Sequence, residues 1–486
     1  MNTLVWLQRE LRTTHLPALQ SALAHSAQHG GAVILAYFHD PAQTVGGAQS
    51  ANTLRLAHGL TYLRERIRKL GGDLWIVAGD FERALEGLIR TQQIGAVHYT
   101  YQPGEPFQTM QQQALTVCRR NKIALQPFFS ESLLPPDSVL NGQGKPYAVF
   151  TPFYKALQAQ AARIEPLDEA VGDWSRLKPA DPACSVLPES LQALMQRPWA
   201  QGLMANETPG EVAAWARLQR FAQEDMADYA LQRDFPALPA TSALSVALHF
   251  GELNVRAVYC YLLALQEAGG VDSGGSQAWL RQLVWREFAR YLLWHAPHSQ
   301  FEPFQSKFAA MPWDEDAAAL QHWQRGQTGI PIVDAGMREL WQTGTMHNRV
   351  RMLVASLLTK NLNQNWRVGQ AWFDYTLFDA DPANNAMGWQ WVAGCGVDAS
   401  PYYRLFNPVL QSRKFDEQGD YIRRWLPELR RLSAKAIHAP WEQPLECQMK
   451  GVRLGVDYPL PIVDLQASRA AHLQRVEAMK TPGNMT

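Results

Sequence analysis

The first 130 residues alternate between short apolar runs and longer helical segments, and this alternation limits the possible folds more than any other feature. Runs rich in β-branched and aromatic residues occur at residues 3–7, 32–38, 73–79, 96–101 and 123–129. Continuous apolar strands separated by helices are typical of a parallel sheet with both faces covered. We therefore predict an α/β domain with a five-stranded parallel sheet over residues 1–130. No GxGxxG follows the first run, so this domain is not a standard dinucleotide-binding unit.

The pattern changes twice along the rest of the chain. Residues 131–200 are rich in proline and turn residues, and they predict an interdomain linker. From residue 201 onward the strand pattern ends and helical periodicity dominates. We therefore predict an all-α domain over residues 201–486, and no internal repeat is visible.

Composition excludes some classes of protein. The formal net charge of the 486 residues is zero, so a nucleic-acid surface would have to be a local basic patch. The five cysteines form no CxxC pair, which favours a reducing compartment over a disulfide framework or a zinc site. No apolar run approaches the roughly 20 residues of a membrane span, and the N-terminal run is too short for a signal peptide. We expect a cytosolic protein.

Tryptophan gathers in the second half of the chain, which holds 12 of the 17. Four of them fall within residues 366–391, interleaved with Asp379, Asp381, Asn384 and Asn385. Indoles beside carboxylates and amides suit a pocket for a flat, redox-active ligand. A tryptophan-rich core with polar loops fits this segment equally well. Paired carboxylates also suggest a metal site or a hydrolase, but no histidine ligand spacing accompanies them.

Two further segments combine polar and apolar groups in ways that suit a ligand. The hydroxyl residues of TSALS (241–245) precede an apolar run, where they could cap a helix or help its N–H groups to hold a phosphate. Gln282 and Trp285 are three residues apart, so they share a helix face near Trp279. That face could hold a planar base, although an ordinary core helix with a polar rim explains it too.

A third segment, MHNRVRM (346–352), places Asn348, Arg351 and Met352 on one helical face. An amide, a cation and a thioether are an unusual set for a plain core. Arg351 could instead pair with a nearby acid such as Asp379. His347 is more often a packed histidine than a catalytic one.

Together these segments resemble the cryptochrome/photolyase family, and most of all the cyclobutane pyrimidine dimer DNA photolyases. The similarity runs from TLVWLQRELR (3–12) through YAVFTPF (147–153) and TSALS to YPLPIVD (458–464). Its most specific stretches are WREF (285–288), MHNRVRM, NWRVGQAWF (365–373), DADPANN (379–385), WQW (389–391) and PYYRLFNP (401–408). The resemblance implies an α/β antenna domain, a linker and a helical domain that binds FAD in a U shape.

The resemblance also implies roles for single residues. Positions that contact FAD match Tyr229, Thr241, Ser242, Leu244, Ser245, Arg286, Arg351, Asp379, Asp381 and Asn385. Within this set Asn385 matches the residue that faces flavin N5, where an amide tunes the flavin by hydrogen bonding. The electron relay to the flavin matches Trp313, Trp366 and Trp389, because indole is among the side chains most easily oxidised.

The resemblance further implies a pocket for a pyrimidine dimer taken out of the DNA stack. This pocket matches Gln282, Trp285, Asn348, Met352 and Trp391. Arg349 and Arg404 match positions that hold DNA phosphates, whose contacts position the strand without reading its sequence. UV-damaged DNA is therefore the expected partner. We expect the protein to be a monomer without membrane contact, and in a prokaryote to be associated with the nucleoid. No metal is expected.

The chain departs from the family pattern at Gln282, where dimer photolyases usually carry a glutamate. A neutral amide can still bond the edge of the dimer but supplies neither charge nor a proton, so we expect retained binding with altered repair efficiency. The (6-4) photolyases carry two histidines where this chain has Asn348 and Met352, which disfavours that alternative. A cryptochrome-like blue-light sensor is the main rival, and a flavin oxidoreductase acting on a small molecule is a weaker one.

The N-terminal region also departs from the family, since WLQRELR stands where W-F-R-x-D-L-R is usual. Residues 99–108 follow the antenna-binding loop only loosely. A second chromophore, folate or deazaflavin, is therefore possible, and its identity stays open.

Overall fold

The computed structural model describes residues 1–399 and 404–480, and the chain divides into two compact units. The first unit comprises Met1–Ala230, Ser242–Pro297 and Phe378–Ala383. The second unit comprises Leu231–Thr241, His298–Leu377 and Asn384–Thr486. The sequence-predicted boundaries at 1–130, 131–200 and 201–486 stay a prediction. Among the described residues, no helix has the length and apolar character that crossing a membrane requires.

A five-stranded parallel sheet forms the N-terminal part of the first unit, in the order β3-β2-β1-β4-β5, as the apolar runs predicted. Its strands are β1 (Asn2–Leu7), β2 (Val33–His39), β3 (Trp75–Ala78), β4 (Ile94–Thr100) and β5 (Ala124–Phe128). The strand order reverses between β1 and β4, and the crevice at the carboxyl ends near such a point is where open α/β sheets bind ligands.

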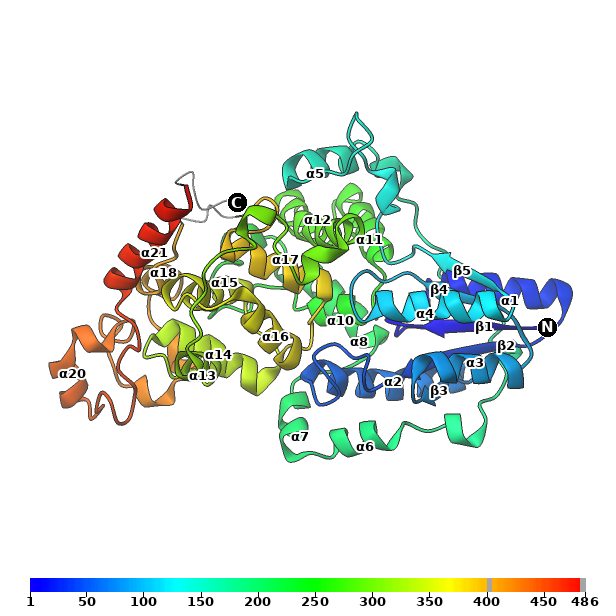
Figure 1. Ribbon diagram of the computed structural model, residues 1–486, viewed down its shortest axis with the longest axis horizontal. Coiled ribbons are helices and arrows are strands. Elements are labelled where there is room, and N and C mark those ends of the chain that lie inside the picture. The colour runs from blue at the N-terminus through cyan, green and yellow to red at the C-terminus, as the bar shows by residue number, and fades with distance from the viewer. Residues whose placement is uncertain (400–403, 481–486) are drawn as a thin grey trace. The chain divides into compact units, whose positions relative to one another are not determined.

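Helices cover both faces of this sheet (Figure 1). They are α1 (Pro17–His29), α2 (Ala51–Lys69), α3 (Phe81–Thr91) and α4 (Phe107–Arg120). Side chains alternate along β1, so Val5 and Leu7 pack with α1 and α2 while Leu4 and Trp6 pack with α3 and α4. Both faces of β1 are thus buried, which explains why its sequence is continuously apolar.

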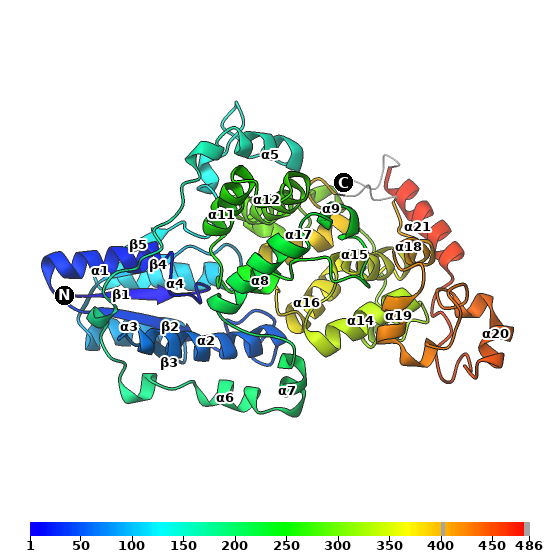
Figure 2. The same cartoon turned by 180° about the vertical axis from the view of Figure 1, so that it is seen from behind.

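The remainder of the first unit is helical. It contains α5 (Phe150–Gln158), α6 (Glu189–Met195), α7 (Pro198–Met204), α8 (Glu211–Glu224), the start of α9 (Tyr229–Gln232), α10 (Ser245–His249), α11 (Val255–Glu267) and α12 (Ser273–His295). Side chains cap α11 and α12, since Asn254 accepts from the backbone of α11 and Asp272 from that of α12. Helices α11 and α12 pack side by side (Figure 2).

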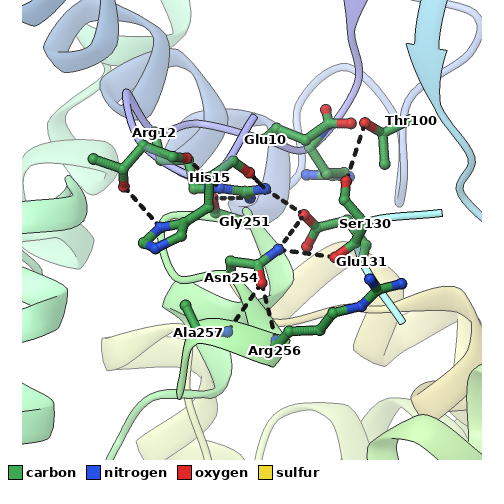
Figure 3. Close-up of polar contacts among 12 residues, drawn as sticks. Glu10, Arg12, His15, Thr100, Ser130, Glu131, Gly251, Asn254, Arg256 and Ala257 are labelled. Carbon is green, nitrogen blue, oxygen red and sulfur yellow. Dashed lines mark hydrogen bonds and ion pairs between the residues drawn. The ribbon is translucent and has the colours of Figure 1, made fainter. Parts of the chain in front are cut away.

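A buried polar cluster joins the α/β domain to α11 within the first unit (Figure 3). Arg12 forms an ion pair with Glu131 at 2.7 Å and donates to the carbonyl of Gly251 at 2.8 Å. Asn254 donates to the carbonyl of Ser130 at 2.8 Å while its side-chain oxygen caps α11. Each buried charge therefore has a partner, as burial of charged groups requires.

Among its described residues, the second unit contains only helices as regular elements, as the sequence predicted for this part of the chain. Its described helices are α13 (Ala317–Gln324), α14 (Pro331–Thr343), α15 (Asn348–Ser356), α16 (Trp366–Thr376), α17 (Pro382–Ala393), whose first two residues lie in the first unit, α18 (Pro408–Phe415), α19 (Asp420–Trp425), α20 (Pro444–Met449) and α21 (Leu465–Lys480). One π-helical turn, Leu357–Asn361, follows α15 directly. Such turns are rare and occur often near functional sites.

Candidate functional site

The TSALS segment leads into α10, but its hydroxyls do not cap that helix. Leu244 is the N-cap residue of α10 and makes no side-chain cap hydrogen bond. Ser242 instead accepts from the indole Nε1 of Trp279 at 3.1 Å. Leu244 is buried, whereas Ser245 and Thr241 are exposed, and Thr241 belongs to the second unit. The capping interpretation is therefore wrong, and a ligand-binding role for these hydroxyls stays a prediction.

Arg286 on α12 has unused hydrogen-bonding capacity in a buried place. Its Nη2 donates to the carbonyl of Leu248 at 3.4 Å, but its buried Nη1 has no hydrogen-bond partner among the described residues. Burial and the neighbouring Arg290 lower the pKa of Arg286. An orphaned, buried cationic donor is costly unless an acceptor binds it, which suits an anionic ligand. Tyr229, predicted for the same ligand, is buried with its ring 5.6 Å from that of Phe221.

Asp381 is the centre of a buried polar group in the first unit. Nη1 of Arg290 lies 3.3 Å from its Oδ2, and Nδ1 of His249 lies 4.0 Å from the same oxygen. Neither partner was predicted from the sequence. Arg290 lies four residues after Arg286 and therefore on the same face of α12, which was an available signal. Asp379 is buried nearby, and its backbone carbonyl accepts from the N–H of Asp381 at 2.7 Å.

Trp285 has one face of its indole covered. The ring of Phe150 stacks on it with a centroid separation of 3.6 Å and an interplanar angle of 6°. One indole face is therefore unavailable to a ligand, and a nucleobase could stack only on the other. Gln282 shares the helix face as predicted, and its amide makes a long contact of 3.5 Å with the carbonyl of Ala278.

In the second unit, Asn385 has a fixed amide orientation. Its Nδ2 donates to the carboxylate of Asp374 at 2.6 Å and to the carbonyl of Gln370 at 3.1 Å. Both amide hydrogens are thereby used, so Oδ1 is the atom that Asn385 presents to a ligand. A side chain held in this way can accept a hydrogen bond at a defined place.

The predicted relay tryptophans differ in burial. Trp389 and Trp366 are each 2% exposed, whereas Trp313 is half-buried. Trp389 packs edge-on against Phe373 at 5.0 Å and Trp323 at 6.1 Å, and its Nε1 has no hydrogen-bond partner among the described residues. The series therefore includes buried and partly exposed indoles, while its role in electron transfer stays a prediction.

The face of α15 predicted from the sequence begins at the first residue of the helix, Asn348, which is exposed. Arg351 donates from Nε to the carbonyl of Met346 at 2.8 Å, and Met352 is half-buried. Arg349 is more strongly engaged than expected for a phosphate ligand, with Asp234 at 2.6 Å and the ring of Phe415 at 3.9 Å.

Arg404 is exposed, and its guanidinium lies 5.4 Å from the ring centroid of Phe406. The buried Lys360 of the π-helical turn donates from Nζ to the backbone carbonyl of Arg404 at 2.5 Å. Trp391 on α17 is half-buried. The first part of the PYYRLFNP motif, residues 401–403, lies outside the described residues.

A separate hollow, open to solvent, lies at the carboxyl ends of β1 and β2 in the first unit. Trp6, Arg9, Tyr37, Asn52 and Phe107 are among its lining residues. Nε and Nη1 of Arg9 are buried there with no hydrogen-bond partner among the described residues. Aromatic walls and a cation with free donors suit a flat ligand that carries acceptor atoms.

Two family models match the chain: "DNA photolyase" over residues 3–171 and "FAD binding domain of DNA photolyase" over residues 279–478. A curated relative, the deoxyribodipyrimidine photo-lyase of Agrobacterium fabrum, is 39% identical, covering 98% of each chain. The Arabidopsis thaliana cryptochrome-2 is 32% identical, covering 96% of this chain and 77% of the relative. The crystal structure of a class III photolyase from Agrobacterium tumefaciens superposes with a TM-score of 0.88 at 38% identity, covering 99% and 98% of the two chains.

Proposed function

Because the chain belongs to the DNA photolyase family, to which cryptochromes are also related, we propose that it is a deoxyribodipyrimidine photo-lyase. Its substrate is a cyclobutane pyrimidine dimer in UV-damaged DNA, and FAD is its cofactor. The observation that carries this proposal is the orientation of Asn385, whose amide hydrogens are both bound within the chain. An amide held with its oxygen outward suits a ligand atom that carries a proton, such as flavin N5 in its reduced form.

The described residues fit FAD. Buried donors without partners, such as Nη1 of Arg286, need an acceptor, and the phosphates and carbonyls of the cofactor supply acceptors. When bound and reduced, FAD absorbs blue or near-UV light and supplies the electron that splits the dimer. The proposed ligands are Tyr229, Thr241, Ser242, Leu244, Ser245, Arg286, Arg351, Asp379, Asp381 and Asn385.

The remaining residues bind, orient and shield the reactants. The ion pair between Asp381 and Arg290 places a fixed charge at the cofactor. Trp389, Trp366 and Trp313 are the proposed relay, through which an electron from the surface reaches the flavin. Because splitting of the dimer would involve no net redox change, it would require no general acid and no nucleophile of the chain.

Most of the residues proposed to bind the lesion have aromatic or amide side chains. Trp285 can offer a base only one face of its indole, because Phe150 covers the other. Gln282, Asn348, Met352 and Trp391 complete the proposed lesion pocket. A damaged base leaves the stack at lower cost than an intact one, as is general for photolyases and other base-flipping enzymes. Arg404 and Arg349 hold the strand through its phosphates, although Arg349 must share its charge with Asp234.

We also propose that the hollow at β1 and β2 holds a second, light-gathering chromophore. Its aromatic walls and the free donors of Arg9 support a flat, conjugated ligand such as a deazaflavin or a folate. Fluorescence of the extract from purified protein identifies the compound. Substitution of Thr44, which also lines the hollow, by tryptophan should fill it and exclude this chromophore while FAD stays bound.

The function is tested by illuminating the purified protein with oligonucleotides that contain either a cyclobutane dimer or a (6-4) product. We expect light-dependent loss of the dimer alone, with flavin absorbance in the protein. Loss of the (6-4) product alone would assign the other repair activity. Bound flavin without loss of either lesion would favour the light-sensor alternative, which Gln282 keeps open.

We propose that the protein is a monomer, because one chain supplies every residue of the proposed site, and size-exclusion chromatography with light scattering checks this proposal. A DNA substrate places the enzyme in the compartment that holds the DNA, which is the cytoplasm and its nucleoid in a prokaryote.

A further inference from the structure

Asp381 is held by residues that in turn are anchored by the α/β domain. On one side, Arg290 donates from Nη1 to Oδ2 of Asp381 at 3.3 Å and from Nη2 to Oε1 of Gln102 at 2.9 Å. Gln102 lies just after β4. The guanidinium is therefore fixed between an amide oxygen and the carboxylate, which sets the direction from which the carboxylate is approached.

On the other side, a buried asparagine of α2 determines how a histidine is oriented. Asn52 donates from Nδ2 to the carbonyl of Phe378 at 2.9 Å, and its Oδ1 accepts from Arg9 at 3.0 Å. The reversed amide would place oxygen against the carbonyl and NH₂ against the guanidinium, so both contacts would be repulsive. The remaining hydrogen on Nδ2 therefore points to Nε2 of His249, 2.7 Å away.

This arrangement fixes the tautomer of His249. Because Nε2 accepts from Asn52, the ring is neutral and carries its proton on Nδ1. Nδ1 is buried without a hydrogen-bond partner among the described residues, and the carboxylate oxygen of Asp381 lies 4.0 Å from it. That separation exceeds a hydrogen bond but allows the N–H dipole to act on the charge.

The groups that face His249 oppose its protonation. Burial is the main cause that holds the pKa of His249 well below its usual value, and Arg9 adds to it. Arg286 and Arg290 act in the same direction, while Asp381 acts against them. The imidazole is thus kept neutral beside Asp381, which agrees with the tautomer deduced from the hydrogen bonds.

We propose that Asn52 and His249 are positioning residues that orient Asp381 for the flavin, with Asn52 locking His249 as the neutral Nδ1–H tautomer. The proposal rests on the proposed function, in which Asp381 contacts the flavin ring. Asp381 is then fixed from two directions. Gln102 holds the cationic Arg290 on one side, and Asn52 holds the neutral ring of His249 on the other. The α/β domain in this way determines the geometry of a cofactor ligand that lies 279 residues after Gln102 and 329 residues after Asn52 in the sequence.

The first measurement is the tautomer itself, by ¹⁵N NMR of protein labelled at histidine, with and without bound FAD. His249→Leu assigns the signal by its loss. We expect a neutral ring with the proton on Nδ1 in the native protein and a shift toward the Nε2–H form in Asn52→Ala. A native ring that carries its proton on Nε2, or one that is charged at pH 7, would overturn the proposal whether or not FAD binds.

The second measurement is FAD affinity, followed by the fluorescence of released flavin. We expect about tenfold weaker binding for Asn52→Ala, a loss of about 1.4 kcal/mol. His249→Asn keeps an N–H near the position of Nδ1, so it should bind FAD more tightly than His249→Leu. Equal affinity of Asn52→Ala and the native protein would refute the positioning role.

Asn254→Ala is the matched control, because Asn254 and Asn52 are both asparagines of the first unit and are both 1% exposed. Asn254 belongs to the cluster around Glu131 (Figure 3), and among the described residues its side chain bonds Ser130, Glu131 and the start of α11 rather than His249 or Asp381. The Asn254→Ala variant should have a lower melting temperature, but its His249 tautomer and its FAD affinity should equal those of the native protein. If Asn52→Ala and Asn254→Ala lost the same FAD affinity, the loss would reflect general destabilisation, and the positioning role of Asn52 would be refuted. Native protein that binds no FAD would instead contradict the proposed function.

Discussion

Gly369 on α16 is the position at which one methyl group should most disturb the proposed electron relay. A Cβ atom added there would lie 2.1 Å from Cη2 and 2.4 Å from Cζ3 of Trp389, and 2.7 Å from Cδ2 of Leu358. Carbon atoms in contact stay about 3.5–4.0 Å apart, so the indole must move by roughly 1.5 Å. Trp389 is 2% exposed and packed against Phe373, so it has little room to do so.

The size of the effect of Gly369→Ala follows from two opposing contributions. Overpacking of a buried site costs about 1–3 kcal/mol. The replacement of glycine by alanine inside a helix returns about 1 kcal/mol. Because the clash involves a large ring, we expect the upper part of the first range and a net loss of about 1–2 kcal/mol in the free energy of unfolding.

Urea unfolding followed by circular dichroism measures this loss, and the rate of flavin photoreduction under blue light measures the displacement of Trp389. The matched control is Gly388→Ala on α17, next to Trp389 in sequence, where an added Cβ meets nothing within 4 Å. This control should equal or exceed the native stability. Native-like unfolding and photoreduction of Gly369→Ala would refute the steric argument and weaken the assignment of Trp389 to the relay.

Three further predictions concern the lesion, the π-helical turn and DNA. Gln282→Glu should raise the repair quantum yield, because a carboxyl group can stabilise charge that develops on the dimer; equal yields and equal binding would contradict this. Burial lowers the pKa of Lys360 to about 7, so above that pH the unfolded chain binds a proton that the folded chain does not. Stability should therefore rise with pH between about 7 and 10 by up to about 1.4 kcal/mol per unit, and urea unfolding of Lys360→Met should lack this slope; parallel slopes would contradict the assignment. Arg404→Ala should reduce the slope of log K against log salt by about 1, since it removes one phosphate contact, and an unchanged slope in a filter-binding titration would exclude that contact.

The sequence predicted the α/β part closely because its signal is local. The apolar run at residues 32–38 becomes β2, Val33–His39, with both faces buried. The helical faces around Gln282 and Asn348 were likewise predicted from spacing within one helix. Elements whose pattern depends only on neighbouring residues are the ones that a single sequence reveals best.

The rest could not be predicted because it depends on contacts between distant residues. Nothing around Asn52 indicates that its amide bonds the carbonyl of Phe378. The stacking of Phe150 on Trp285 is a contact between α5 and α12, which are far apart in the sequence. The capping interpretation of TSALS failed for a related reason, since Ser242 is used by the distant indole of Trp279. Tertiary partners compete with local ones for the same polar atoms.

The segment Phe378–Ala383 belongs to the first unit although the chain on both sides of it belongs to the second. Its hydrogen bond to Asn52 spans 326 residues. At about 5–20 residues per second, a ribosome needs on the order of tens of seconds to make the chain between them. Throughout that interval the nascent first unit lacks the six residues of this segment, among them the buried Phe378. Completion of the first unit thus waits for the C-terminal half of synthesis, and a truncated product released early should be a target for chaperones and proteases.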